Sequence, residues 1–179
     1  MVSGRKIREA GMTLAYRQTL QDESLNPLEH VELLAASNDW PIARTGEDEA
    51  QMAVSAAGAE LQITMSWRED TESLYLACMF DLKAPAARRA EVARLINMIN
   101  ERLLMGHFDF WTADGLAIYR NALLLSGGAQ ATEAQCESLI ALALQACERY
   151  YPAFQFVIWA GKTAQDAISA CLFETAGNA

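Results

Sequence analysis

The chain is poor in the residues on which metal and nucleophilic chemistry depend. It has two histidines and four cysteines in 179 residues, with no Cys-X-X-Cys pair and no Gly-X-Ser-X-Gly motif. The cysteines lie among apolar neighbours, which predicts reduced thiols in a core: Cys78, Cys136, Cys147 and Cys171. We therefore expect no catalytic, cofactor-binding or metal-binding residue, and no cofactor.

Positive charge is also scarce, since 14 Lys and Arg face 23 Asp and Glu, for a net charge of −9. Binding to nucleic acid depends on clustered basic side chains, so nucleic acid is not an expected partner. The charge is uneven along the chain. Residues 1–17 hold four basic side chains and one acidic, a sum of +3, so the remainder sums to −12. We expect an N-terminal arm at 1–25 and one domain at 26–179.

Long apolar runs are absent. The longest candidate, SLIALALQAC, is half the length that a membrane-spanning helix needs, about 20 residues. The basic start of the chain lacks the apolar region of an export signal. These features predict a cytoplasmic protein with no membrane insertion.

The pattern of apolar residues indicates helices that cover an antiparallel sheet. Asn26, Pro27 and Glu29 form the start signal of a helix that ends near Ser37-Asn38, with Glu29 closing a capping box. Three or four strands follow, then a helix from Pro85 to Gly106, two strands, and a helix from a Thr132 cap through Tyr150. A helical or irregular piece after Pro152 and a last short helix complete an α+β fold, with a three-strand meander plus a hairpin.

Alternation is clearest in two of the meander strands, which follow a first one at 51–56. One face of each is apolar: Leu61, Ile63, Met65 and Trp67 in the second strand, and Leu74, Leu76, Cys78, Phe80 and Leu82 in the third. The other face of the second strand is polar, with Gln62, Thr64, Ser66 and Arg68. The sheet is therefore expected to have one dry and one polar face.

The segment GHFDFWTADGLAIYRNALLL, residues 106–125, is expected to form the hairpin. Asp114-Gly115 is a strong signal for a two-residue type I′ turn. That turn would place Trp111 opposite Ile118, Phe110 opposite Tyr119, and Asp109 opposite Arg120. The aspartate and the guanidinium would then neutralise each other across the strands.

The same register places His107, Asp109, Trp111, Ile118 and Arg120 on one face of the hairpin, and Phe108, Phe110, Tyr119, Leu123 and Leu125 on the core face. A metal site would need a third ligand that the hairpin does not supply. Trp111 is either covered by a helix of its own chain or anchors a partner, because Trp and Arg are enriched at interfaces. The candidate partner-binding residues are Trp111, Ile118 and Arg120.

Five segments give the chain a resemblance to the YbjN family of bacterial proteins: NPLEHVELLAASNDWP, SWREDTESLYLACMFDLKAP, GHFDFWTADGLAIYRNALLL, ACERYYPAFQFVIWAGK and LFETAG. The resemblance spans residues 26 to 177. It implies an α+β fold similar to type III secretion chaperones and a role as a sensory transduction regulator. It carries over no catalytic residue. Those chaperones are small, acidic homodimers that bind extended segments of partner chains, an analogy of fold.

Together these observations favour a non-enzymatic protein-binding or regulatory domain with a chaperone-like role in signal or stress regulation. The expected partner is a protein segment or a second copy in a homodimer. The alternative is a small-molecule-binding sensor or weak enzyme. Its aromatic pocket would lie near the C-terminal helices, at Tyr150, Tyr151, Phe154 and Trp159.

Overall fold

The computed structural model describes residues 26–56 and 58–176, so the predicted arm at 1–25 lies outside it. Six strands form one sheet in the order β1-β2-β3-β4-β6-β5, and every neighbouring pair is antiparallel. The strands are β1 (Ile42–Gly46), β2 (Glu49–Ala56), β3 (Ala59–Arg68), β4 (Ser73–Lys83), β5 (His107–Trp111) and β6 (Leu116–Leu124). The helices are α2 (Pro27–Ser37), α3 (Arg89–Asn100), α4 (Glu133–Ile158) and α5 (Ala164–Ala176). The α+β class predicted from the sequence is confirmed.

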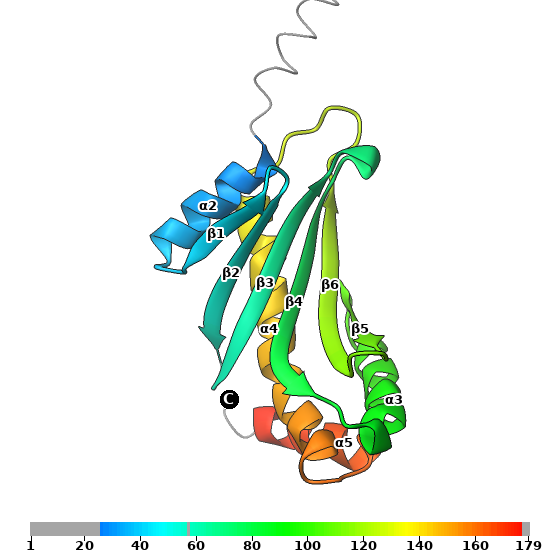
Figure 1. The fold of residues 1–179 in the computed structure, drawn as a ribbon. Coiled ribbons are helices and arrows are strands. Elements are labelled where there is room, and N and C mark those ends of the chain that lie inside the picture. Colours follow the sequence, from blue (N-terminus) through cyan, green and yellow to red (C-terminus); the bar gives the residue numbers. More distant parts are fainter. Residues whose placement is uncertain (1–25, 57, 177–179) are drawn as a thin grey trace, which may run out of the picture.

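The helices lie on one side of the sheet. Figure 1 shows α4 running behind the strands, α2 beside β1, and α3 beside β5. Helix α4 packs on β4 and β6, and α5 packs on α3 and α4. The other side of the sheet faces the viewer in Figure 1, and no helix of the described residues covers it. We call this side the open face.

Helix α2 begins where the sequence predicts, but its cap differs in detail. The side-chain oxygen of Asn26 accepts from the N–H of Leu28 at 3.0 Å. The N–H of Glu29 bonds to the backbone oxygen of Asn26 at 2.8 Å. In a capping box, the Asn26 side chain would accept from the N–H of Glu29. That N–H bonds to the Asn26 backbone oxygen instead, so the expected capping box is wrong.

The meander has four strands, one more than the predicted three-strand meander and the larger of the two numbers that the strand count allowed. Strand β1 is the outer one, and its pairing with β2 is interrupted by an irregularity between Arg44 and Gly46. Arg44 also forms an ion pair with Glu32 of α2 at 2.7 Å. A charged, irregular edge resists pairing with another chain, so this side of the sheet is protected.

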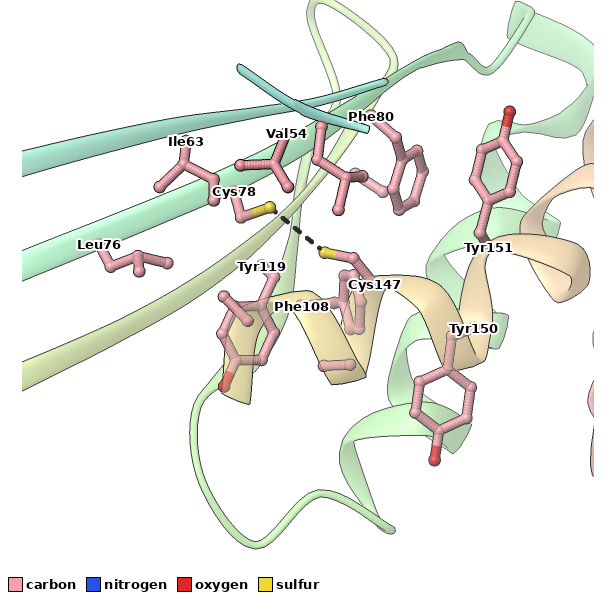
Figure 2. Packing of buried hydrophobic residues seen from close by; sticks show 14 of the residues in the cluster. Val54, Ile63, Leu76, Cys78, Phe80, Phe108, Tyr119, Cys147, Tyr150 and Tyr151 are labelled. Carbon is pink, nitrogen blue, oxygen red and sulfur yellow. Dashed lines mark hydrogen bonds between the residues drawn. The ribbon is translucent and has the colours of Figure 1, made fainter. Parts of the chain in front are cut away.

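The core lies between the sheet and the helices, and it follows the predicted alternation. Leu61, Ile63 and Met65 of β3 are at most 1% exposed. All five predicted residues of the third meander strand are buried too: Leu74, Leu76, Cys78, Phe80 and Leu82. Trp67 is only half-buried, because it lies at the end of β3. Figure 2 shows the centre of this core, where Cys78 and Cys147 lie against each other among aromatic rings.

Helix α4 is longer than predicted. Its start is as expected, with a capping box between Thr132 and Gln135, but it continues through Pro152 to Ile158. A proline inside a helix removes one hydrogen bond and costs about 3 kcal/mol in an isolated helix. The aromatic residues around the proline offset that cost, since Tyr151 and Phe154 both pack on Phe80, with ring centroids 5.2 and 5.1 Å away. Tertiary packing therefore continues the helix through the proline.

None of the helices among residues 26–56 and 58–176 has the length and hydropathy needed to cross a bilayer.

Candidate functional site

The hairpin of β5 and β6 forms, but its register differs from the prediction by two residues. Trp111 pairs with Leu116, Phe110 with Ala117 and Phe108 with Tyr119, which leaves a loop of four residues at 112–115. The predicted two-residue type I′ turn needs positive φ at both central positions, whereas only Gly115 has one, at 75°. The predicted pairings of Trp111 with Ile118, of Phe110 with Tyr119 and of Asp109 with Arg120 are therefore wrong.

Contacts with the preceding segment fix the longer loop. The Gly115 oxygen accepts from the N–H of Ala84 at 2.8 Å, and the Thr112 oxygen accepts from the Arg89 guanidinium at 2.6 Å. A Cβ at Gly115 would lie 2.5 Å from the Ala84 oxygen, so only glycine allows this approach. Tertiary contacts thus override the local turn signal.

A shift of two residues keeps every side chain on its predicted face, because side chains in a strand alternate with a period of two. Asp109 and Arg120 are therefore still neighbours, now diagonal across the strands. The Arg120 Nη1 donates to the Asp109 Oδ2 at 2.9 Å. On its other side the Arg120 Nε donates to the Tyr75 hydroxyl at 2.5 Å, and the guanidinium lies over the Tyr75 ring. The charge neutralisation predicted from the sequence is confirmed.

The pairing of these groups shifts their ionisation. The hydrogen bond from Arg120 lowers the pKa of Asp109, and burial only partly opposes this effect. The backbone N–H of Phe110, 2.8 Å from the Asp109 Oδ1, lowers the same pKa further. The pKa of Arg120 is raised in turn by the Asp109 carboxylate. Both groups are charged at neutral pH, so this carboxylate is no candidate for a general acid.

Arg120 lies at the rim of a hollow of about 450 Å³ in the open face. Five strands and the turn after β3 line it: Glu49, Thr64, Ser66, Arg68, Thr71, Ser73, Tyr75, Ala77, Met79, Trp111 and Arg120. Five of its lining residues carry hydroxyl groups: Thr64, Ser66, Thr71, Ser73 and Tyr75. Ser73 Oγ lies 2.8 Å from the Thr71 hydroxyl, and Ser66 donates to Glu49 at 3.3 Å. The hollow therefore offers fixed hydroxyl groups, a guanidinium and an aromatic rim.

The three residues proposed as partner-binding lie together on this face but are not equally accessible. The Trp111 side chain is 45% exposed, so the interpretation that a helix of its own chain covers it is wrong. Arg120 is half-exposed. Ile118 is fully buried although it faces the open side, between Met79 of β4 and Asp109 of β5 in the register. Trp111 and Arg120 can touch a partner, whereas Ile118 supports the surface from below.

Sequence reasoning missed several contributors to the hollow: Ser66, Arg68, Ser73 and Tyr75. The signal for Ser66 and Arg68 was present, because both lie on the polar face of their predicted strand. Tyr75 lies between the apolar residues Leu74 and Leu76 of β4, so alternation places it on the polar face. Once the strand order is known, the same alternation places it beside Arg120. Strand order is the information that the sequence pattern lacked.

Three of the four residues proposed for the alternative aromatic pocket are packed in the core on the helical side: Tyr150, Tyr151 and Phe154. Tyr150 and Phe154 are at most 1% exposed, and both contact the ring of Phe108. Tyr151 is 9% exposed, and Trp159 alone is open to solvent, at 66%. Close packing of the rings leaves no room for a ligand between them.

The thiols and the two imidazoles offer little chemistry in the described part of the chain. Cys147 and Cys78 are fully buried with their sulfur atoms 3.5 Å apart (Figure 2). The contact with Cys78 and burial raise the pKa of Cys147, which keeps it a thiol at neutral pH. His107 is exposed on the hairpin, and residues 26–56 and 58–176 contain no group of three or more His, Cys, Asp or Glu suited to a metal ion.

Comparison with known proteins agrees with the resemblance seen in the sequence. A search of curated proteins found no match. The family model YbjN, described as "Putative bacterial sensory transduction regulator", matches residues 27–156, from the start of α2 to the last turn of α4. That range includes the whole sheet, the hollow of the open face, and most of the chain. The chain belongs to the YbjN family.

Proposed function

We propose that this domain is a non-enzymatic regulatory module of the cytoplasm that holds an extended segment of another protein on its open face. The observation that carries the proposal is the hollow beside Arg120, which lies on a sheet face that no described helix covers. The family description supports the regulatory part, since it names a regulator of sensory transduction. The analogy with secretion chaperones supports the binding of a segment.

The hollow suits a polypeptide better than a compact ligand. It extends across strands from β2 to β5 of the sheet, a span that an extended chain can follow. The Tyr75 hydroxyl is fixed by the hydrogen bond from Arg120, which lowers the entropy lost when it binds a peptide group, whereas Ser66 and Ser73 are buried.

Arg120 and Trp111 define the chemistry of the segment. Asp109 and Tyr75 hold the Arg120 guanidinium, and its Nη2 nitrogen can still donate to a carbonyl or carboxylate oxygen of a partner. Trp111 offers an exposed ring at the rim, where an apolar side chain can pack. The expected segment therefore has hydrogen-bond acceptors along one edge and an apolar side chain near one end.

The experiment is capture of partners from a cell lysate, followed by mapping of the binding segment with overlapping peptides. A titration of the ¹⁵N-labelled domain with the segment then reports where it binds. The proposal predicts shifted amide resonances in β3, β4 and β6, with Arg68, Tyr75 and Arg120 among them. Shifts confined to the helices would contradict it, and so would a chain that retains no protein partner.

A further inference from the structure

The second half of β6 is a sheet edge that β5 leaves unpaired. Strand β5 pairs only as far as His107 with Arg120, so residues Asn121–Leu124 have β4 on one side and no described strand on the other. Figure 1 shows β6 extending well beyond β5. We call residues 121–124 the β6 edge.

Gly106 is the reason that β5 stops there. Its φ of +66° turns the chain away from β6, and a Cβ at this position would lie 2.2 Å from the Tyr119 hydroxyl. That hydroxyl donates to the Met105 oxygen at 3.0 Å, which fixes the turn. The unpaired edge is therefore built into the fold.

The backbone groups of the β6 edge point toward β4 and outward in alternation. The N–H of Leu125 bonds to the backbone oxygen of Glu72, the residue before β4, so the polar groups of Leu123 also point toward β4. Those of Ala122 and Leu124 point outward. The Asn121 side chain accepts from the N–H of Ala122 at 2.9 Å, as a substitute for a neighbouring strand.

Exposed apolar side chains lie on this edge and on the segment that precedes β5. Leu104, Met105 and Leu124 are 95%, 51% and 71% exposed, and they are three of the six large exposed apolar residues in the described chain. On the helical side, a groove of about 310 Å³ runs between β6 and α4. Its apolar lining includes Met105, Leu123, Leu139 and Leu142.

We propose that the β6 edge pairs with the β6 edge of a second copy of this chain, so that two sheets join into one. The edge carries no Lys, Pro or bulge, the devices that protect the edges of monomeric sheets, whereas β1 carries both a charge and an irregularity. An unprotected edge is a template for pairing with another chain, and a second copy of this chain presents the same edge. A two-fold axis through the edge also makes the same surface complementary to itself.

The register of this pairing follows from the outward backbone groups, with the Asn121 side chain giving up the N–H of Ala122 to the second copy. Both outward residues find partners when Ala122 of one copy faces Leu124 of the other, which centres the axis on Leu123. A register shifted toward Arg120 would enter the space that β5 occupies. In the proposed register the two Leu123 side chains meet on the helical side, between the two apolar grooves.

This surface is separate from the hollow of the open face, so the two proposals can fail independently. Sedimentation velocity of the full chain tests the dimer. We expect a dimer for the parent chain, and at least tenfold weaker association for Leu124→Asp and for Ala122→Pro, which removes the outward N–H. Leu33→Asp is the matched control, since Leu33 is 66% exposed on α2 at the other side of the sheet. Because each copy carries a charge of −9, added salt should strengthen the dimer.

Cross-linking tests the register and does not depend on weakening the fold. The four native cysteines are buried, so an introduced thiol is the accessible one. Under a copper–phenanthroline oxidant, Leu123→Cys should form a covalent dimer much faster than Leu124→Cys or Leu33→Cys. A parent chain that is monomeric up to its solubility limit would overturn the proposal. Equal cross-linking at positions 123 and 33, or a dimer that neither edge variant weakens, would overturn it as well.

Discussion

The ion pair between Asp109 and Arg120 can be measured with a double-mutant cycle. The variants are Asp109→Asn, Arg120→Met and the double variant, and the quantity is the free energy of unfolding in urea, followed by circular dichroism. Arg120→Met also removes the hydrogen bond to Tyr75, and the cycle separates that loss from the coupling with Asp109.

The structure sets the size of the coupling. At 2.9 Å, Coulomb's law gives about 1.4 kcal/mol in water, and both side chains are more than one third exposed. Holding two exposed side chains together costs entropy, and such pairs contribute about 0.2–1 kcal/mol. Because Tyr75 already orients the Arg120 guanidinium, we expect the upper half of that range. The matched control is the cycle for Glu32 and Arg44, which are 2.7 Å apart and similarly exposed.

Salt and pH give the coupling a definite signature. It should fall in 1 M salt, where the screening length is about 3 Å. The pKa of Asp109 is lower in the folded chain than in the unfolded chain. Its contribution to stability is therefore complete above the unfolded pKa, near 3.9, and is lost as the pH falls through the folded pKa. A coupling of zero at low salt, or one that grows on acidification, would refute the interpretation of this pair as charge neutralisation.

Two further predictions concern the backbone at Gly106 and the buried thiols. Gly106→Ala should destabilise the chain by clearly more than Gly127→Ala in urea unfolding. Both positions have positive φ, which costs about 1–2 kcal/mol for alanine, but of the two only Gly106 has a side chain, that of Tyr119, within contact distance. Equal losses of stability would show that the Tyr119 side chain moves aside at no cost. Ellman's reagent should label none of the four cysteines within minutes in native buffer and all four in denaturant, because all four are buried. The contact with Cys78 and burial also raise the pKa of Cys147. Rapid labelling in native buffer would mean that the core opens readily.

The sequence predicts the fold class and the faces of the strands well, because both depend on periodicity. The alternation in β3 and β4 assigns each side chain to the core or to the open face regardless of register. The hairpin illustrates this point: the predicted register is wrong by two residues, yet Asp109 and Arg120 still meet. An error of one residue would have placed them on opposite faces.

Features set by contacts distant in sequence are beyond such reasoning. The hairpin loop is fixed by Ala84, which lies about 30 residues before it. Helix α4 passes through Pro152 because Phe80 of β4 packs on Tyr151 and Phe154. Ile118 was expected to touch a partner, and its burial depends on the neighbours that strand order supplies.

The central claim is tested most directly by measuring how tightly the Trp111→Ala variant binds the mapped partner segment. The Trp159→Ala variant is the control. Trp159 is 66% exposed at the end of α4, away from the open face. If Trp111 anchors the segment, its loss should cost about 2 kcal/mol of binding free energy, a factor of about 30 in Kd. The free energy of unfolding should change by less than about 1 kcal/mol, because the ring is nearly half exposed. An unchanged Kd for Trp111→Ala, or an equal loss for Trp159→Ala, would contradict the account.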